Sequence, residues 1–236
     1  PNEGKPVLNA LKIDVHEYSV PAHNVKQLKD LWEPLRLKGM RYTNRQAFGD
    51  NGFRVARARI TVWDSLAYAL ARIQAQKVRT VSFMLSQDED NDLPLAGLHR
   101  PQDITFTGLE GSEERILIGP GVIAWRLRVE KIASNAKESK LTAYPVFKLA
   151  GVKPMRFQTH LTDSSQIAFL TAAFSVRMGY GDLIVLGPEE SCGDDSTLCG
   201  KFFGIPNYLF LGLDKNDPVK SCPAVRVFVL TCSGTQ

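Results

Sequence analysis

The stretch NGFRVARARI, residues 51–60, carries three arginines within ten residues and is the strongest candidate for binding an anion. Side chains of a strand alternate between its two faces, so Arg57 and Arg59 share one face and Arg54 points to the other. Two arginines on one face are too few for a phosphate-binding track. We interpret them as a solvated face or as ion-pair partners of a neighbouring subunit. We therefore predict Arg57 and Arg59 as intersubunit contacts, and Asn51-Gly52 as the turn that precedes the strand.

The histidines form no recognisable catalytic or metal-binding motif. The four are His16, His23, His99 and His160. The sequence contains neither the metalloprotease motif H-E-x-x-H nor the nucleophile elbow G-x-S-x-G. A Ser-His-Asp triad can still assemble from distant segments, so a hydrolase that uses His99 or His160 stays open as a hypothesis.

Two acidic stretches, residues 86–92 and 192–199, could supply oxygen ligands to calcium. The first lacks the glycine and the terminal glutamate of an EF-hand loop, so we expect a solvated segment instead. The glycine-rich stretches do not fit the phosphate-binding pattern G-x-x-x-x-G-K-[ST], and we expect them to form turns. We therefore predict no metal and no cofactor. A group of aromatic residues could stack on a sugar or fill a core: Phe202, Phe203, Tyr208 and Phe210.

All four cysteines lie in the last fifth of the chain and are disulfide candidates: Cys192, Cys199, Cys222 and Cys232. Three pairings are open; we favour Cys192 with Cys199, and Cys222 with Cys232. Free buried thiols are the main alternative, and zinc is disfavoured because close Cys-x-x-Cys pairs are absent. Disulfides imply an oxidising compartment outside the cytosol.

The elements that would position these residues begin with an alternation of helices and strands. Strand patterns at residues 11–15, 53–60 and 80–86 alternate with helical patterns in residues 25–37 and after Thr61. They predict a small N-terminal α/β module of the order β-α-β-α-β over residues 1–92. The acidic stretch 87–94 is the expected linker.

From residue 93 onward, the hydrophobic pattern has a period of two. Gly, Pro, Asn and Asp clusters separate short strands, as in a sandwich or barrel. We predict strands at residues 103–109, 115–119, 122–132, 140–149, 156–161, 167–178, 182–187, 207–213 and 224–232. The predicted fold class is α+β, in which the α/β module is followed by a predominantly antiparallel β-sandwich over residues 93–236.

Composition limits the function classes. The chain has 236 residues and a net charge of +4, from 29 basic and 25 acidic residues. Such a mixed charge argues against a nucleic-acid-binding surface. The sequence contains no apolar run of the roughly 18 residues that a membrane-spanning helix needs. Because it begins with Pro1, we expect a processed or trimmed chain.

The order LKDLWEPL, NGFRVA and WDSLAYAL, followed by FSVRMGYGDLIVLGP and CGKFFG with VRVFVLT, resembles envelope-associated proteins of planctomycete-type bacteria. That family is functionally uncharacterised, so the resemblance implies an envelope setting and no recognisable enzyme core, but no site residues. The stretch F-x-V-x-x-G-x-G-D-L-I-V-L-G is also similar to the strand-turn-strand of secretins, and ring-forming secretion modules share the mixed element order.

These features together predict a non-enzymatic structural subunit of a bacterial cell-envelope assembly, such as a ring, a pore or a secretin-like complex. We expect a homo-oligomer that is exported to the periplasm or the outer membrane, with other envelope proteins as partners and with membrane association only through them. The alternative is an extracellular β-sandwich module that binds carbohydrate or another ligand. The hydrolase with a scattered triad is the third hypothesis.

Overall fold

Strands dominate a computed structural model of the chain, which describes residues 10–33, 35, 39–132, 138–150, 165–190, 192, 194–211 and 219–235. One six-stranded antiparallel sheet, sheet A, has the order β3-β12-β14-β1-β4, and β13 also pairs with β14. Its strands are β1 (Ala10–Pro21), β3 (Phe53–Arg59), β4 (Gln76–Ser86), β12 (Asp182–Pro188), β13 (Gly204–Leu211) and β14 (Val219–Thr235).

The second antiparallel sheet, sheet B, has the order β2-β11-β9-β8-β5, and β10 also pairs with β9. Its strands are β2 (Met40–Tyr42), β5 (Asp90–Leu98), β8 (Gly121–Lys131), β9 (Glu138–Leu149), β10 (Gln166–Ala168) and β11 (Phe174–Gly179). A separate hairpin consists of β6 (Gln102–Thr107) and β7 (Glu113–Ile118).

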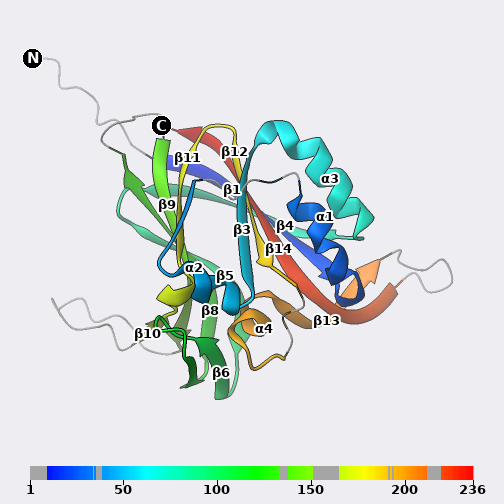
Figure 1. The fold of residues 1–236 in the computed structure, drawn as a ribbon, viewed down its shortest axis with the longest axis vertical. Coiled ribbons are helices and arrows are strands. Elements are labelled where there is room, and N and C mark those ends of the chain that lie inside the picture. Colours follow the sequence, from blue (N-terminus) through cyan, green and yellow to red (C-terminus); the bar gives the residue numbers. More distant parts are fainter. Residues whose placement is uncertain are drawn as a thin grey trace, which may run out of the picture.

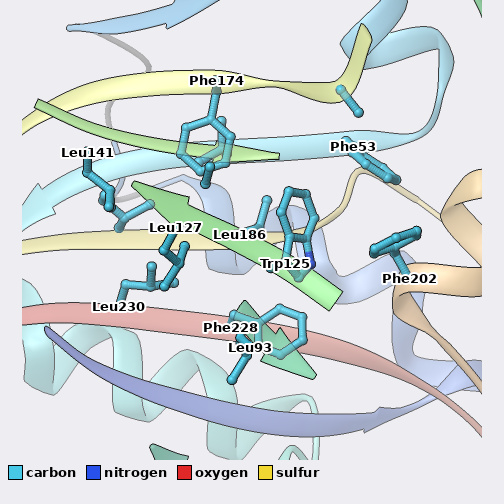
Figure 2. Packing of buried hydrophobic residues seen from close by; sticks show 14 of the residues in the cluster. Phe53, Leu93, Trp125, Leu127, Leu141, Phe174, Leu186, Phe202, Phe228 and Leu230 are labelled. Atoms are coloured by element: carbon cyan, nitrogen blue, oxygen red, sulfur yellow. The ribbon is translucent and has the colours of Figure 1, made fainter. Parts of the chain in front are cut away.

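Sheets A and B pack face to face, and the main hydrophobic core lies between them. Trp125 of β8 is 1% exposed and lies at the centre of an aromatic cluster (Figure 2). Its ring centroid lies 5.7 Å from that of Phe53 and 5.8 Å from that of Phe202. These rings come from β3, β8 and α4 (Leu198–Phe203), so the core joins segments that are far apart in sequence.

Helices cover the other face of sheet A, so this sheet is buried on both sides. Figure 1 shows α1 (Leu28–Trp32) and α3 (Trp63–Arg72) on the side of sheet A that faces away from β8 and β9. Leu31 of α1 and Leu66 and Leu70 of α3 pack there against Val185 and Val227. Burial on both faces explains why β12 reads as a continuous apolar run rather than as an alternating one. The remaining helices are η1 (Ala22–Gln27), α2 (Arg45–Asp50), η2 (Ile60–Val62) and η3 (Leu170–Ala172).

The predicted β-sandwich is confirmed, but the structure does not show the predicted β-α-β-α-β module. Strands β1, β3 and β4 do belong to one sheet, yet β12 and β14 lie between β3 and β1. Strands from both sides of residue 92 therefore pair within sheet A, and the division into 1–92 and 93–236 is not marked by a break between sheets. Hydrophobic periodicity locates strands, but it does not identify their partners.

Three local predictions need correction or lie outside the description. The expected linker at 87–94 is wrong, because residues 90–98 form β5, which pairs with β8. The expected strand at 167–178 is divided into β10, η3 and β11. The expected strand at 156–161 lies outside the described residues.

The aromatic cluster predicts that Trp125→Ala destabilises the protein. Removing a fully buried indole leaves a cavity between the sheets, and we expect the free energy of unfolding to fall by about 3–5 kcal/mol. Urea unfolding followed by circular dichroism measures this loss. Tyr68→Ala is the control, because Tyr68 is 69% exposed and should change stability by no more than about 0.5 kcal/mol.

His16 predicts a pH dependence of stability. Its ring packs edge-on against Trp63, with centroids 5.5 Å apart, and burial together with the charge of Lys77 lowers its pKa below 6.5. The unfolded chain therefore takes up the proton more readily, and stability should fall as the pH drops from about 6.5 through the pKa of the folded state. Denaturant unfolding at several pH values should show this loss, and His16→Gln should reduce it. The exposed His23 serves as the control, and a profile in which His16→Gln and His23→Gln behave alike would contradict the prediction.

Candidate functional site

The predicted site residues Arg57 and Arg59 meet at one buried carboxylate, that of Asp182. The Nη2 atom of Arg57 donates to Oδ2 of Asp182 at 2.8 Å, and Nη1 of Arg59 donates to Oδ1 at 3.0 Å. The backbone N–H of Gly179 also donates to Oδ2, at 2.9 Å. The Asp182 side chain is 1% exposed, so three donors satisfy a carboxylate that has almost no access to solvent.

This carboxylate lies where the chain crosses from sheet B to sheet A. The turn between β11 and β12 contains Gly181, whose φ of 77° is a backbone conformation that favours glycine. In the register of β12 with β3, Asp182 is opposite Arg59 and Ile184 is opposite Arg57. Asp182 and both arginines therefore project from the same face of sheet A.

The predicted alternation along β3 agrees with its packing. Phe53 and Val55 belong to the core between the sheets, whereas Ala56 belongs to the core under the helices. Arg54 points the other way, lies 5.2 Å from the ring of Trp32 and forms a 3.6 Å ion pair with Glu189. An intersubunit role for Arg57 and Arg59 stays a prediction; within the chain, both stabilise the Asp182 corner.

Arg57 also lines a basic pocket of about 360 Å³ at the edge of the sandwich. We define this basic pocket by its lining residues: Gly39, Arg41, Arg57, Ile132, Lys140, Ser175, Val176 and Arg177. Four of these residues are cationic, and none of the eight is acidic. The pocket lies beside the start of β2, the edge strand of sheet B, and next to β3, the edge strand of sheet A.

The strand register brings the cations of the basic pocket together. Arg177 of β11 lies directly opposite Lys140 of β9, and Arg41 of β2 lies directly opposite Ser175 of β11. The Nζ atom of Lys140 pairs with Glu130 at 3.0 Å. The side chains of Arg41 and Arg177, in contrast, have no hydrogen bond or ion pair with any residue that the structure describes. The pocket therefore has a surplus of positive charge.

The same face of sheet B ends in carboxylates at its opposite edge. One row of directly paired positions crosses the whole sheet, from Arg41 through Ser175, Thr142 and Arg128 to Asp90. The turn before β5 adds Asp88 and Glu89, both exposed. We call residues 88–90 the acidic turn. We call the edge of sheet B that carries Arg41 of β2 and Arg177 of β11 the basic edge. The two lie at opposite edges of one sheet.

Ion pairs neutralise most charges between these two edges. Arg126 pairs with Asp90 at 3.3 Å and with Asp92 at 2.8 Å, and Lys148 also pairs with Asp92. Burial opposes ionisation of Asp92, but the hydrogen bonds from Arg126 and Lys148 outweigh it and lower the pKa of this carboxyl. Glu89, at the exposed turn, has no side-chain partner among the described residues.

Sequence reasoning missed Arg41, Lys140 and Arg177. Arg41 belongs to β2, a strand of three residues that the hydrophobic pattern did not predict. In FSVRMG the arginine alternates with apolar residues, which places it on the solvated face of a strand. The position of this strand between β2 and β9 could not be read from the sequence, so its arginine could not be assigned to a cluster.

The cysteine predictions divide into one success and one error. Cys192 and Cys199 form the predicted disulfide. The predicted pair Cys222–Cys232 is wrong, because both residues lie on β14 and both are free thiols. Ten residues of extended strand span about 33 Å, whereas the Cα atoms of a disulfide lie within about 7 Å. Burial raises the pKa of the Cys232 thiol.

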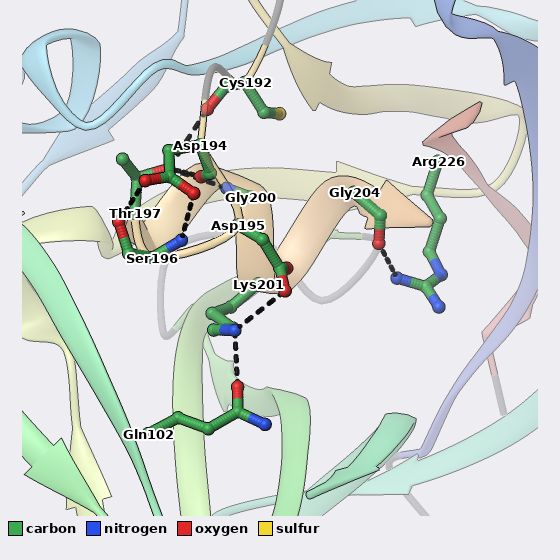
Figure 3. A network of polar contacts seen from close by, with 10 residues as sticks. All are labelled: Gln102, Cys192, Asp194, Asp195, Ser196, Thr197, Gly200, Lys201, Gly204 and Arg226. Carbon is green, nitrogen blue, oxygen red and sulfur yellow. Dashed lines mark hydrogen bonds and ion pairs between the residues drawn. The ribbon is translucent and has the colours of Figure 1, made fainter. Parts of the chain in front are cut away.

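The disulfide loop is held by its own hydrogen bonds (Figure 3). The Oγ1 atom of Thr197 accepts from the N–H of Gly200 at 3.0 Å and so caps helix α4, while Asp194 accepts from Ser196. The buried Lys201 pairs with Asp195 at 3.2 Å. A cluster of three or more acidic, His or Cys residues that could bind a metal is absent from the described residues. A second cavity, of about 270 Å³, lies beside this loop.

The remaining candidates do not assemble into a site. His16 contacts Thr80, whereas His23 and His99 are exposed, and their side chains have no hydrogen-bond or ion-pair partner among the described residues. His160 lies outside the described residues. Among the aromatic candidates, Phe202, Phe203 and Phe210 are 0% exposed, so they fill the interior rather than form a stacking surface. Tyr208 packs against Phe210 with ring centroids 4.7 Å apart.

Among the helices of the described ranges, none is both long enough and apolar enough to span a membrane. No protein-family model, no curated protein and no solved structure matches the chain.

The Asp182 corner predicts that Asp182→Asn destabilises the fold. The amide keeps the shape of the carboxyl but removes the charge that compensates Arg57 and Arg59, and its NH₂ group would face a donor. We expect a loss of about 1–3 kcal/mol in urea unfolding. Asp103→Asn is the matched control, because Asp103 pairs with Arg115 at an exposed position and should leave the unfolding midpoint unchanged.

Proposed function

We propose that this protein is a non-enzymatic structural subunit that assembles head to tail with copies of itself in a bacterial cell envelope. The observation that carries the proposal is the opposite charge of the two edges of sheet B. The basic edge presents Arg41 and Arg177 without partners in the described chain, and the acidic turn presents Glu89 in the same condition. One copy can therefore place its acidic turn against the basic edge of the next.

Strand edges favour such a contact. Within the described residues, β2 pairs only with β11 and β5 pairs only with β8, so each leaves one side of its backbone without a strand partner. Such edges are common sites of association between sheets. Because the two edges are different surfaces, their contact is heterologous and builds a ring or an open filament. This is the geometry that a ring-forming envelope subunit needs.

The envelope setting rests on two further observations. The Cys192–Cys199 disulfide is compatible with an oxidising compartment, such as the periplasm. The sequence also resembles envelope-associated proteins of planctomycete-type bacteria. In this proposal the subunit is exported, other envelope proteins are its further partners, and any association with the membrane is through those partners.

The two alternatives have less support. A carbohydrate-binding module would need exposed aromatic side chains, and three of the four candidates are buried. A hydrolase would need a histidine near both a serine and an aspartate. Among the described residues, His16 hydrogen-bonds to Thr80 and no histidine hydrogen-bonds to a serine or an aspartate, and no nucleophile elbow is present in the sequence.

A charge exchange tests the assembly. Arg41→Glu and Glu89→Arg each place like charges across the proposed interface, so each should weaken self-association about tenfold or more. The double variant restores opposite charges and should recover the oligomer. Mass photometry at micromolar concentration measures the distribution of species, and assembly of the unaltered protein should weaken as salt shortens the range of the attraction.

Arg41 and Glu89 suit this test because neither side chain has a partner in the described chain. Reversing the charge at either position should therefore leave the fold intact. Arg100→Glu is the control, since Arg100 is exposed and lies outside both edges. An unaltered protein that is monomeric at micromolar concentration would contradict the proposal. So would a double variant that associates no better than the single ones.

A further inference from the structure

We propose that the basic pocket binds a phosphoryl group, in the form of a free phosphate or of a phosphate carried by a larger envelope molecule. This inference goes beyond assembly, because it assigns a ligand to the cavity behind the edge rather than a partner to the edge itself. It rests on the pocket's four cations and one hydroxyl, on the fixed position of Arg57, and on the surplus of charge among the cations.

Arg57 is held in place before any ligand arrives. Its Nη2 atom binds the buried Asp182 carboxylate, and its side chain is only 24% exposed. Its Nη1 atom approaches Gly39, where a β-carbon would lie 3.5 Å from it. Gly39 has a φ of 85°, which other residues rarely adopt, so the chain bends there beside the guanidinium group. A donor fixed in this way loses little entropy when it binds an anion.

Arg177 and Lys140 form a like-charge pair that the fold alone does not explain. They are directly opposite each other on β11 and β9, and like charges in such positions destabilise a sheet. Glu130 offsets the charge of Lys140, and Glu138 on the same strand has an interaction of its own. Arg177 keeps its full charge, with Ser175 two residues away on the same face. Local conflicts of this kind are typical of functional sites.

The charges match a phosphoryl group better than a carboxylate. The pocket contains four cations, and the two carboxylates that contact them, Asp182 and Glu130, leave a surplus of about two. A phosphate monoester carries about −1.5 to −2 charges at neutral pH, whereas a carboxylate carries −1. The guanidinium fork also suits phosphate oxygens, because it can donate two parallel hydrogen bonds. A pocket of about 360 Å³ is larger than one phosphate, so it can also hold part of a carrier molecule.

The experiment uses full-length protein that carries Glu89→Arg, so that binding is measured on a species expected to be monomeric. Isothermal titration calorimetry at low salt measures affinity for inorganic phosphate and pyrophosphate, with acetate as a monocarboxylate at equal ionic strength. Flotation with vesicles that contain phosphatidic acid, whose headgroup is a phosphate monoester, against vesicles of phosphatidylcholine alone, tests a lipid-borne phosphate. Arg177→Gln is the test variant, and Arg100→Gln is its matched control.

We expect phosphate or pyrophosphate to bind more tightly than acetate, and Arg177→Gln to weaken that binding about tenfold or more, since a charge-assisted hydrogen bond is lost. Arg100→Gln should leave it unchanged. Flotation that depends on Arg177 would identify a lipid headgroup as the source, and binding of the free anions alone would identify a soluble phosphate. No binding of any phosphate form, equal binding of acetate, or insensitivity to Arg177→Gln would overturn the inference.

The two proposals fail separately. If the unaltered protein does not assemble, the titration still reports on the pocket, because it is carried out on a monomer. If phosphate does not bind, the charge exchange between Arg41 and Glu89 still reports on assembly. Thermal unfolding of Arg177→Gln, expected to occur at no lower a temperature than in the parent because the like charge opposite Lys140 is removed, shows that a lost affinity is not a lost fold.

Discussion

The buried carboxylate of Asp182 is the constraint on which the edge of this sandwich depends. A carboxylate that is 1% exposed must be paired and hydrogen-bonded, and its three donors come from the end of β11 and from β3. The crossing from sheet B to sheet A is thereby tied to the outermost strand of sheet A. As a consequence, Arg57 is fixed beside Gly39, and the cavity between the two sheet edges acquires a positively charged wall.

A second buried ion cluster joins neighbouring strands in the middle of sheet A. Glu17 of β1 accepts from Nε of Arg79 at 2.6 Å and from Nε of Arg226 at 3.1 Å, and Arg226 also donates to the carbonyl oxygen of Gly204. Glu17 and Arg226 are both nearly buried, and burial lowers the pKa of Arg226. This cluster therefore serves the closure of sheet A, where β1 lies between β14 and β4. The Asp182 corner has the same ratio of two arginines to one carboxylate, but it differs because Arg57 also lines the basic pocket, where it lies among further cations.

The sequence was sufficient for most of the strands and for one disulfide, but it missed β2 and β5 and did not show how the strands pair. Alternation located β8, β9 and β12 closely and placed Arg57 and Arg59 on one face of β3, because side-chain parity is a local property. It could not show that β12 and β14 separate β3 from β1, because such pairing depends on contacts between distant segments. The acidic residues of 87–94 suggested a linker, whereas Arg126 and Arg128 on the neighbouring strand pair with three of the four carboxylates, those of Asp88, Asp90 and Asp92, and so favour the pairing of β5. The basic pocket was missed for the same reason: its cations come from β2, β3, β9 and β11, and only the folded register brings them together.

The charge pattern of sheet B also bears on the symmetry of any assembly. A two-fold dimer through one edge would bring one basic edge against another, or one acidic turn against another, because an isologous contact uses the same surface twice. Like charges disfavour both arrangements. The middle of sheet B does not favour either a two-fold or a head-to-tail contact, because its cationic side chains are each paired with a carboxylate: Arg126, Arg128, Lys140 and Lys148. What remains is an acidic turn at one edge and unpaired arginines at the other, and only a head-to-tail contact brings these opposite charges together.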